Sequence, residues 1–121
     1  MKDFSGDNLS VYKTTTGNAA FTAAWTGVRS SNIEVPKGKY VAVFKYSVPF
    51  SEGIYYARIF CNGNEFATET KVANPYYNLK GTLTGIVELS GDSTFCCDIG
   101  CAQSSAVGKQ VYWDLRVVKV G

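Results

Sequence analysis

The side chains that could carry acid–base chemistry in this sequence are ten carboxylates, because the chain contains no histidine. Without histidine, neither a Ser-His-Asp nor a Cys-His nucleophile system can be assembled, and the commonest general base near neutral pH is missing. A glycosidase-type carboxylate pair remains as an alternative, but the acids are spread over turns and alternating strand positions without a cluster. The glycine-rich loops GxGxxG and GxxxxGK[ST] are also absent, so a nucleotide cofactor has no anchor. We therefore expect a protein that is not an enzyme and has no cofactor.

Cysteines are the other chemically reactive side chains, at Cys61, Cys96, Cys97 and Cys101. A zinc site would need paired Cys-x-x-Cys units or histidines, which this sequence lacks, so no metal is expected. Cys97 and Cys101 share the strand alternation of their apolar neighbours, and cysteine often packs as a small buried hydrophobe. We expect buried free thiols. One structural disulfide and, after it, a metal site are the alternatives.

Residues suited to ligand contact are aromatic and amide side chains rather than charges. Tyr and Trp offer stiff contact area at low entropic cost, while Ser, Gly and Asn adapt around them. This inventory suits hydrogen bonding and ring stacking against sugars or small epitope patches better than electrostatic capture. The candidate ligand-binding residues are Tyr76, Tyr77 and Asn78 in one loop, followed by Trp25, Arg29 and Tyr55. The alternative for each aromatic residue is that it packs in the core or in a subunit interface and does not contact a ligand.

Length and charge set the class of molecule that must position these residues. The chain has 121 residues, which is the size of one domain, and its 45% hydrophobic content favours a packed globule over disorder. A net charge of +2 without a block of like charges argues against nucleic acid as a partner. No apolar run approaches the roughly 18 residues of a membrane span, so membrane insertion is not expected. We expect residues 1–9 to be a leader or linker remnant and residues 10–121 to form a single head domain.

Strand-length runs broken by Gly, Pro and Asn recur along the chain, and no window shows a helical apolar stripe. The run YVAVFKYSV at residues 40–48 predicts the central strand. Asn62-Gly63 predicts a type I′ hairpin turn between strands at 54–61 and 65–72. Further strands are expected at 9–13, 21–26, 81–89, 95–101 and 110–120, with a polar turn at 14–18 and a loop at 28–32. This pattern predicts an all-β jelly-roll sandwich of about eight to ten antiparallel strands. An immunoglobulin sandwich is disfavoured because Trp25 precedes every cysteine.

Three segments in order resemble signatures of the tumour-necrosis-factor and complement globular-head superfamily. They are GKYVAVFKY at residues 38–46, TGIVELSGD at 84–92 and QVYWDL at 110–115, and an Arg-x-x-x-Asn-Gly hairpin at 58–63 lies between the first two. The resemblance covers residues 33–120 and implies a jelly-roll head. No Gly-X-Y collagen stalk precedes it, and the closing RVVKVG resembles the ends of phage tail-fibre and receptor-binding proteins. The resemblance therefore implies a C-terminal receptor-binding head of a phage tail-fibre or baseplate protein.

A homotrimer is expected both from this resemblance and from apolar residues on both faces of the central and final strands. A monomeric sandwich needs only one apolar face, so the second set calls for another partner. We expect Tyr112 at the three-fold axis and Asp114 paired with Arg116 between subunits. The expected trimer-interface residues are Val41, Val43, Thr82, Thr84, Ile86, Tyr112, Asp114, Arg116 and Val118.

These expectations lead to a function in binding. The first hypothesis is a receptor-binding head that recognises a host-surface glycan or protein at the tip of a trimeric phage tail fibre or similar appendage. The alternatives are a structural trimerisation, capping or capsid-decoration module, and a secreted complement-head-like or spore-surface binding domain. The expected location is the virion or the extracellular space.

Overall fold

Nine β-strands run through the part of the chain that the computed structural model describes, which is residues 11–23, 25–48, 53–73, 79–102 and 107–120. They are β1 (Val11–Ala20), β2 (Gly27–Arg29), β3 (Ile33–Val35), β4 (Gly38–Val48), β5 (Gly53–Cys61), β6 (Asn64–Ala73), β7 (Leu79–Leu89), β8 (Ser93–Cys101) and β9 (Gln110–Lys119). Within these described residues, no helix is long and apolar enough to cross a membrane.

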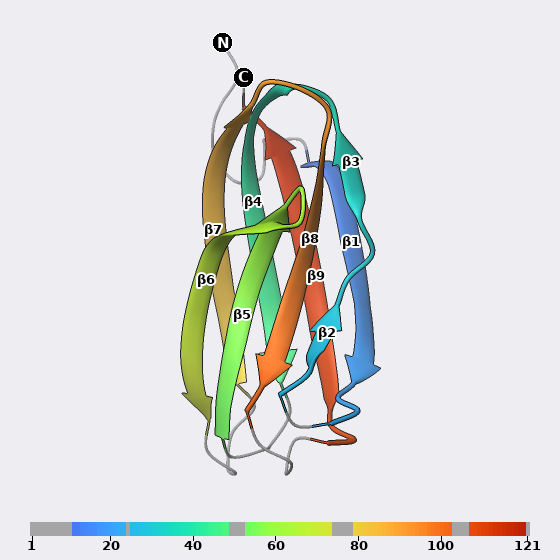
Figure 1. Ribbon diagram of the computed structural model, residues 1–121, viewed down its shortest axis with the longest axis vertical. Coiled ribbons are helices and arrows are strands. Elements are labelled where there is room, and N and C mark those ends of the chain that lie inside the picture. Colours follow the sequence, from blue (N-terminus) through green and yellow to red (C-terminus); the bar gives the residue numbers. More distant parts are fainter. Residues whose placement is uncertain (1–10, 24, 49–52, 74–78, 103–106, 121) are drawn as a thin grey trace.

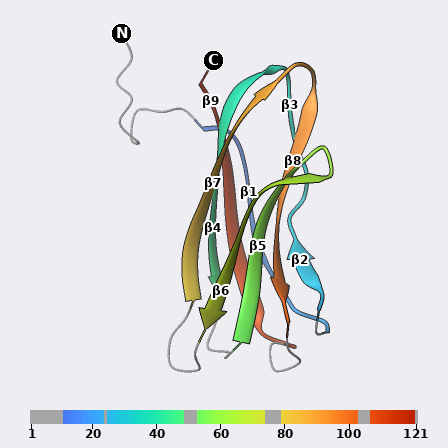
Figure 2. The same ribbon diagram turned by 60° about the vertical axis from the view of Figure 1, so that its left-hand side comes forward.

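The strands form two sheets that face each other (Figures 1 and 2). The four-stranded sheet has the order β1-β9-β4-β7, and the five-stranded sheet has the order β2-β8-β5-β6, with β3 also paired to β8. Pairing between these strands is antiparallel throughout. Except between β2 and β3 and within the β5–β6 hairpin, the chain changes sheet from each strand to the next, which is the connectivity of a jelly roll. The predicted fold class is therefore confirmed.

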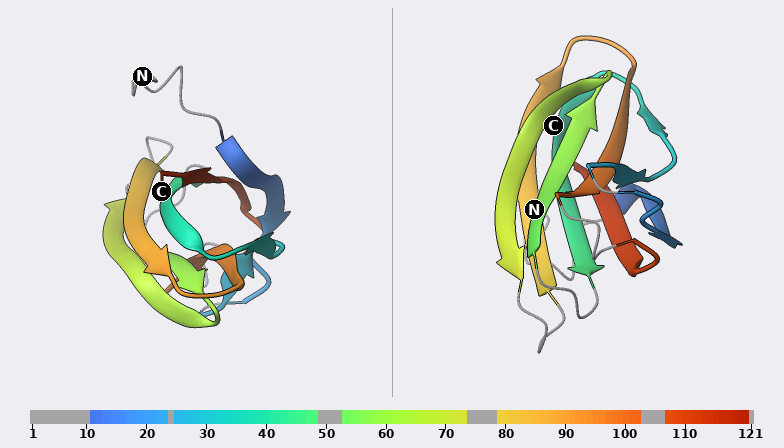
Figure 3. Two further views of the ribbon diagram at one scale, coloured as in Figure 1. Left: turned by 90° about the horizontal axis from the view of Figure 1, so that it is seen from above. Right: turned by 60° about the horizontal axis from the view of Figure 1, so that its bottom comes forward.

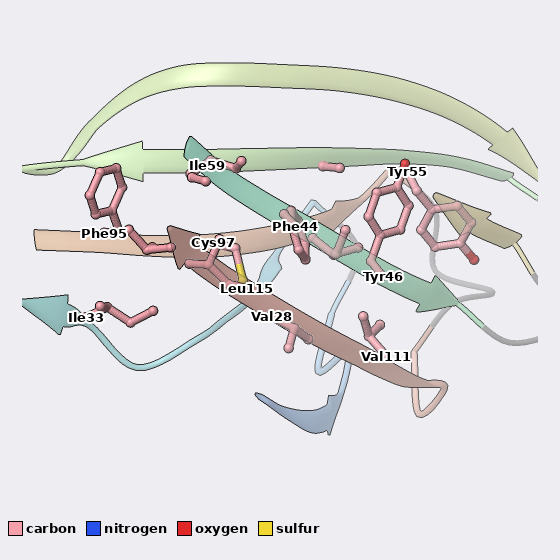
Figure 4. Packing of buried hydrophobic residues seen from close by; sticks show 14 of the residues in the cluster. Val28, Ile33, Phe44, Tyr46, Tyr55, Ile59, Phe95, Cys97, Val111 and Leu115 are labelled. Atoms are coloured by element: carbon pink, nitrogen blue, oxygen red, sulfur yellow. The ribbon is translucent and has the colours of Figure 1, made fainter. Parts of the chain in front are cut away.

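The core lies between the sheets, which curve around a common interior when seen from above (Figure 3). On β4, every second side chain from Tyr40 to Val48 is at most 3% exposed. From the opposite sheet, Tyr55 and Ile59 on β5 and Phe95 on β8 complete the packing (Figure 4). This period of two follows from the pleat of a strand, whose successive side chains point to opposite faces. The prediction of a central strand is confirmed, since β4 is hydrogen-bonded to β7 on one side and to β9 on the other.

The β5–β6 hairpin turns at the predicted pair. Asn62 has a φ of 53° and Gly63 a φ of 79°, so both central residues lie in the left-handed region that a type I′ turn requires. The Asn62 side chain also accepts a hydrogen bond from the backbone N–H of Thr94 at 2.9 Å and donates to Ser93 Oγ at 3.1 Å. The turn is therefore fixed locally by its own sequence and tied to the start of β8.

The first third of the chain differs from the prediction. Residues 14–18, expected as a polar turn, lie inside β1, where Thr14 Oγ1 donates to the carbonyl of Leu115 at 3.0 Å. No strand forms at 21–23 or 25–26, the described residues of the strand expected at 21–26, where Phe21 makes an isolated bridge to Val107 and its ring is buried. The loop expected at 28–32 overlaps β2, and β3 follows it. A ladder to β9 stabilises the threonine-rich segment as a strand, which shows tertiary pairing overriding a local turn signal.

None of the four cysteines forms a disulfide, which confirms the prediction of free thiols. Cys96, Cys97 and Cys101 are buried and Cys61 is half-buried. Burial raises the pKa of the Cys97 thiol to about 12, and a hydrogen bond from Ser30 opposes that rise only in part. These thiols therefore behave as small apolar side chains at neutral pH.

Candidate ligand-binding site

Strands β2, β8 and β5 lie side by side in the five-stranded sheet (Figure 1). The outer face of these strands carries a hollow of about 280 Å³. It combines aromatic rings, a guanidinium group and bare backbone within one small surface. Its lining residues are Trp25, Thr26, Gly27, Tyr56, Arg58, Gly100 and Cys101.

Trp25 stands at the rim of this hollow with 75% of its surface exposed. Its φ is 61°, a conformation that is rare for a bulky residue and that costs roughly 1–3 kcal/mol. Two hydrogen bonds fix the segment to the end of β8, because Trp25 N–H donates to the Cys101 carbonyl at 2.9 Å and Cys101 N–H donates to the Thr26 carbonyl at 3.1 Å. The chain thus holds a large apolar ring in solvent by means of a strained backbone. Strain of this kind concentrates at binding sites.

Two glycines face each other across the β2–β8 ladder and form the floor of the hollow. A Cβ atom on Gly27 would lie 2.4 Å from Asp98 Oδ2, so only glycine allows β2 to approach that carboxylate. A Cβ on Gly100 would make only ordinary contacts, the nearest at 3.5 Å from Arg58 Nη2. Gly100 is itself buried and lies beside Tyr56, its register partner on β5, whereas Gly27 is exposed.

A row of charged side chains crosses the sheet next to this floor, because Arg29, Asp98 and Arg58 are register neighbours on β2, β8 and β5. Asp98 is 4% exposed. Arg58 donates to Asp98 Oδ1 from Nη2 at 2.5 Å and from Nε at 3.1 Å, whereas Arg29 Nε is 3.8 Å from Asp98 Oδ2. Both guanidinium groups also lie over the ring of Phe60, at 4.4 Å for Arg29 and 5.6 Å for Arg58. The row is therefore built around a buried carboxylate that two cations share.

The structure brings together only part of the predicted ligand-binding set. Trp25 and Arg29 lie on the same outer face. Tyr55 does not, because it is 1% exposed and its ring packs 5.9 Å from that of Phe21 in the core. Its neighbour Tyr56 takes the outward position, since successive strand residues face opposite ways. The remaining candidates, Tyr76, Tyr77 and Asn78, lie outside the described residues.

The prediction also missed residues of this site. Tyr56 is one step from the predicted Tyr55, and the period of two could have selected it had the face of β5 been known. Arg58 entered the sequence analysis only as part of a hairpin motif, and Asp98 only as one of the scattered acids. No local signal in the sequence couples these two residues, because β5 and β8 are distant in sequence and meet only in the sheet.

On the opposite side of the molecule, the outer face of the four-stranded sheet collects every residue predicted for the trimer interface. Val41 on β4 has Val118 of β9 and Ile86 of β7 as its two register partners. Ile86 is 65% exposed and Tyr112 52% exposed. The full set is Val41, Val43, Thr82, Thr84, Ile86, Tyr112, Asp114, Arg116 and Val118.

Asp114 and Arg116 are the charged residues of this face, and the sequence suggested a pair between subunits. The structure pairs them within the chain, where Arg116 Nε and Nη2 donate to the two oxygens of Asp114 at 3.2 Å each. Residues two apart on one strand share a face, so this pair forms without a partner subunit.

A larger hollow, of about 530 Å³, lies near the β5–β6 turn and includes Glu34, Pro36, Asn62 and Asp92 in its lining. Asn62 uses its side chain to hold the start of β8. Its lining contains no aromatic ring. We therefore place the candidate site at the Trp25 hollow, where two aromatic rings and a guanidinium group converge.

Comparisons with known proteins bear on the fold. No protein-family model matches the sequence, and no curated protein matches it either. Among solved structures, the globular domain of zebrafish complement 1qA protein is similar, with a TM-score of 0.58 at 13% identity over 89% of this chain and 97% of that chain. The C-terminal domain of EclA, described as a sugar-binding protein, is similar with a TM-score of 0.52 at 12% identity over 97% and 88%.

The insecticidal delta-endotoxin Cry8Ea1 of Bacillus thuringiensis is also similar, with a TM-score of 0.53 at 12% identity over 79% of this chain, which spans 19% of the toxin's length. At these identities the likeness concerns the fold alone. The expected resemblance to the complement globular head is confirmed at that level, and this chain has the jelly-roll architecture of these domains.

Proposed function

We propose that this protein is a carbohydrate-binding domain that recognises a surface glycan through the Trp25 hollow on the five-stranded sheet. The observation that carries the proposal is the exposed indole of Trp25, held in solvent by a backbone with positive φ above a floor of two glycines. An L-residue of this size is unfavourable in that conformation, and 75% of its surface gains nothing from burial. Binding of a ligand against the ring accounts for both features.

The chemistry of the hollow suits a sugar ring. The apolar face of a pyranose can cover an indole, and its hydroxyl groups need donors and acceptors at the rim. Arg58 supplies N–H donors next to the ring of Tyr56, and Gly27 is an exposed residue of the floor. The fold itself supports the proposal, since the similar EclA domain is described as sugar-binding.

Binding measurements with oligosaccharides test this proposal. We expect saturable binding that Trp25→Ala weakens by about tenfold, because covering about 60 Å² of ring contributes about 1.5 kcal/mol. Trp25→Tyr keeps an aromatic face and should retain most of the affinity. Val72→Ala, which trims another exposed side chain of the same sheet, serves as the control. Binding that survives Trp25→Ala unchanged would place the ligand elsewhere and refute the proposal.

We further propose that the outer face of the four-stranded sheet joins three copies into a trimer with Tyr112 at its axis. Exposed Ile86 with Val41 beside it forms a small apolar patch, and Tyr112 adds an exposed aromatic ring further along the same sheet face, so this face favours contact with a second surface. The internal pairing of Asp114 with Arg116 supports this, because a neutralised pair costs less to cover than two lone charges.

Light scattering at micromolar concentration tests the assembly, and we expect the mass of a trimer. Tyr112→Asp should dissociate or aggregate it. Val72→Asp provides a matched control, because Val72 is 77% exposed but lies on the other sheet. A monomeric wild-type protein would contradict the assembly proposal without touching the glycan site.

The setting that unites the two surfaces is a receptor-binding head on a trimeric phage tail fibre or similar appendage, acting in host attachment on the virion or in the extracellular space. The patch on the four-stranded sheet also supports a second candidate, a structural trimerisation or capping module. Glycan titration distinguishes the receptor-binding head from the structural module. A structural cap forms trimers but shows no saturable glycan binding that depends on Trp25.

A further inference from the structure

The charged row beside the hollow carries one more positive than negative group. Arg29 and Arg58 flank a single carboxylate, Asp98, whose side chain is 5% exposed. Arg58 directs two donors at Asp98 Oδ1, so this pair is close to neutral as a unit. Arg29 lies 3.8 Å from Asp98 Oδ2, which is beyond hydrogen-bonding distance, and this is its one ion pair among the described residues. The surplus charge of the row therefore resides on Arg29.

Arg29 is also held in place and open to solvent. Its guanidinium carbon lies 4.4 Å from the centroid of the Phe60 ring, a cation–π contact that fixes the plane of the group. Its side chain is nevertheless 55% exposed, so its donors can reach a ligand. The nearby thiol of Cys96 adds no competing negative charge at neutral pH, because burial raises its pKa.

The spacing of the sheet sets the distance from this cation to the hollow. Arg29 and Gly27 are two residues apart on β2 and share one face, as are Arg58 and Tyr56 on β5. Two residues along a strand span about 7 Å. A sugar ring seated over Tyr56 and Gly100 would therefore carry a substituent on its near edge into the row of Arg29.

From this geometry we propose that the Trp25 hollow takes a pyranose that carries a carboxylate, of the hexuronic acid class, with the carboxylate bound by Arg29. This inference rests on the proposed function and names the class of sugar that the same site recognises. The planar fork of a guanidinium matches a carboxylate, and the single surplus charge matches a monoanion better than a phosphate dianion. Arg58 remains engaged with Asp98 and balances the charge of that carboxylate.

The test uses four acidic probes and their neutral counterparts with the same rings. Oligomers of galacturonate, mannuronate and guluronate and a hyaluronan tetrasaccharide are each titrated calorimetrically, next to their carboxyl methyl esters. At low salt we expect at least one acid to bind about tenfold or more tightly than its ester, since a hydrogen bond to a charged group is worth about that factor. Raising the salt should reduce this preference, because the contact is partly exposed.

Arg29→Gln is the decisive variant. It should remove the preference for the acid while leaving binding of the ester and the melting temperature nearly unchanged. Arg58→Gln is unsuitable, because it would leave the buried Asp98 charge without its main partner. Trp25→Ala should weaken the acid and its ester alike.

The outcomes separate this inference from the proposed function. If the wild-type protein binds an ester as tightly as its acid, or if Arg29→Gln keeps the preference, the hexuronate inference is overturned and the glycan-binding proposal stands. If the neutral sugars bind but none of the acids does, the inference is overturned in the same way. If no acid, no ester and no neutral glycan binds, both proposals fail together.

Discussion

Two variants, Trp25→Ala and Trp25→Gly, separate the cost of the backbone conformation at position 25 from the contribution of the indole ring to stability and binding. Both variants remove the ring. Only glycine also relieves the positive φ of 61°, because alanine keeps a Cβ atom that is unfavourable in the left-handed region. The difference in stability between the two variants therefore measures the free-energy cost of the positive φ at position 25.

The magnitudes follow from exposure and conformation. Trp25 is 75% exposed, so about 60 Å² of a large aromatic side chain is buried, and losing it costs both variants about 1.5 kcal/mol. Relief of the left-handed conformation contributes roughly 1–2 kcal/mol to the glycine variant. The greater freedom of glycine in the unfolded chain offsets about 0.5–1 kcal/mol of that gain. The glycine variant should therefore be the more stable of the two by about 1 kcal/mol, or roughly 4 °C in melting temperature.

Thermal and urea unfolding of the two variants measures this difference, and glycan titration measures the loss of the ring. We expect the order wild type, glycine, alanine in stability, and an equal loss of affinity in both variants. An alanine variant more stable than the glycine variant by about 0.5–1 kcal/mol would show that the backbone at position 25 carries no strain. Unequal affinities of the two would mean that the backbone, rather than the indole, contributes to binding.

Three further predictions concern other positions. Gly27→Ala should destabilise the protein by about 2 kcal/mol in urea unfolding, because its Cβ would displace the buried Asp98 carboxylate. Gly91→Ala is the control, and it should change stability by less than about 0.5 kcal/mol because the space around Gly91 is open. Equal effects of the two substitutions would contradict the close approach of β2 to Asp98. Gly63→Val should cost about 1–2 kcal/mol, because its φ is 79° and valine is strained there, and a variant that melts like the parent would count against the I′ turn. The Cys97 pKa is raised from 9.0 to about 12, so the unfolded chain loses this proton first and stability should fall as pH rises from about 9 to 12. Native labelling by iodoacetamide at pH 8 should be slow, and fast labelling of the folded protein would show that the thiol is accessible.

The sequence predicted the elements whose signals are local. Asn62-Gly63 specifies its turn because both residues tolerate positive φ, so no distant contact is needed. The strand at β4 is recognisable from its own alternation of apolar residues. The secondary-structure prediction was wrong where the local signal was weak. Threonines in β1 read as a turn, although the ladder to β9 holds them in a strand.

The candidate site illustrates the same limit at the scale of single residues. Trp25 and Arg29 were selected by residue type and lie on the outer face of the five-stranded sheet, whereas the predicted Tyr55 lies in the core. Two adjacent tyrosines on one strand must face opposite ways, and the sequence of that strand alone does not say which one faces the core. The structure buries Tyr55 and leaves Tyr56 on the surface.

What the sequence by itself determined is an all-β domain, its central strand, its tight hairpin and a set of side chains without histidine. These follow from alternation, turn chemistry and composition, which are properties of neighbouring residues. Only the tertiary structure decided that Arg29, Asp98 and Arg58 form one row beside the Trp25 hollow. The physical reason is register, since hydrogen bonds between strands far apart in sequence fix which residues become neighbours, and a slip of one residue would turn this row into the core.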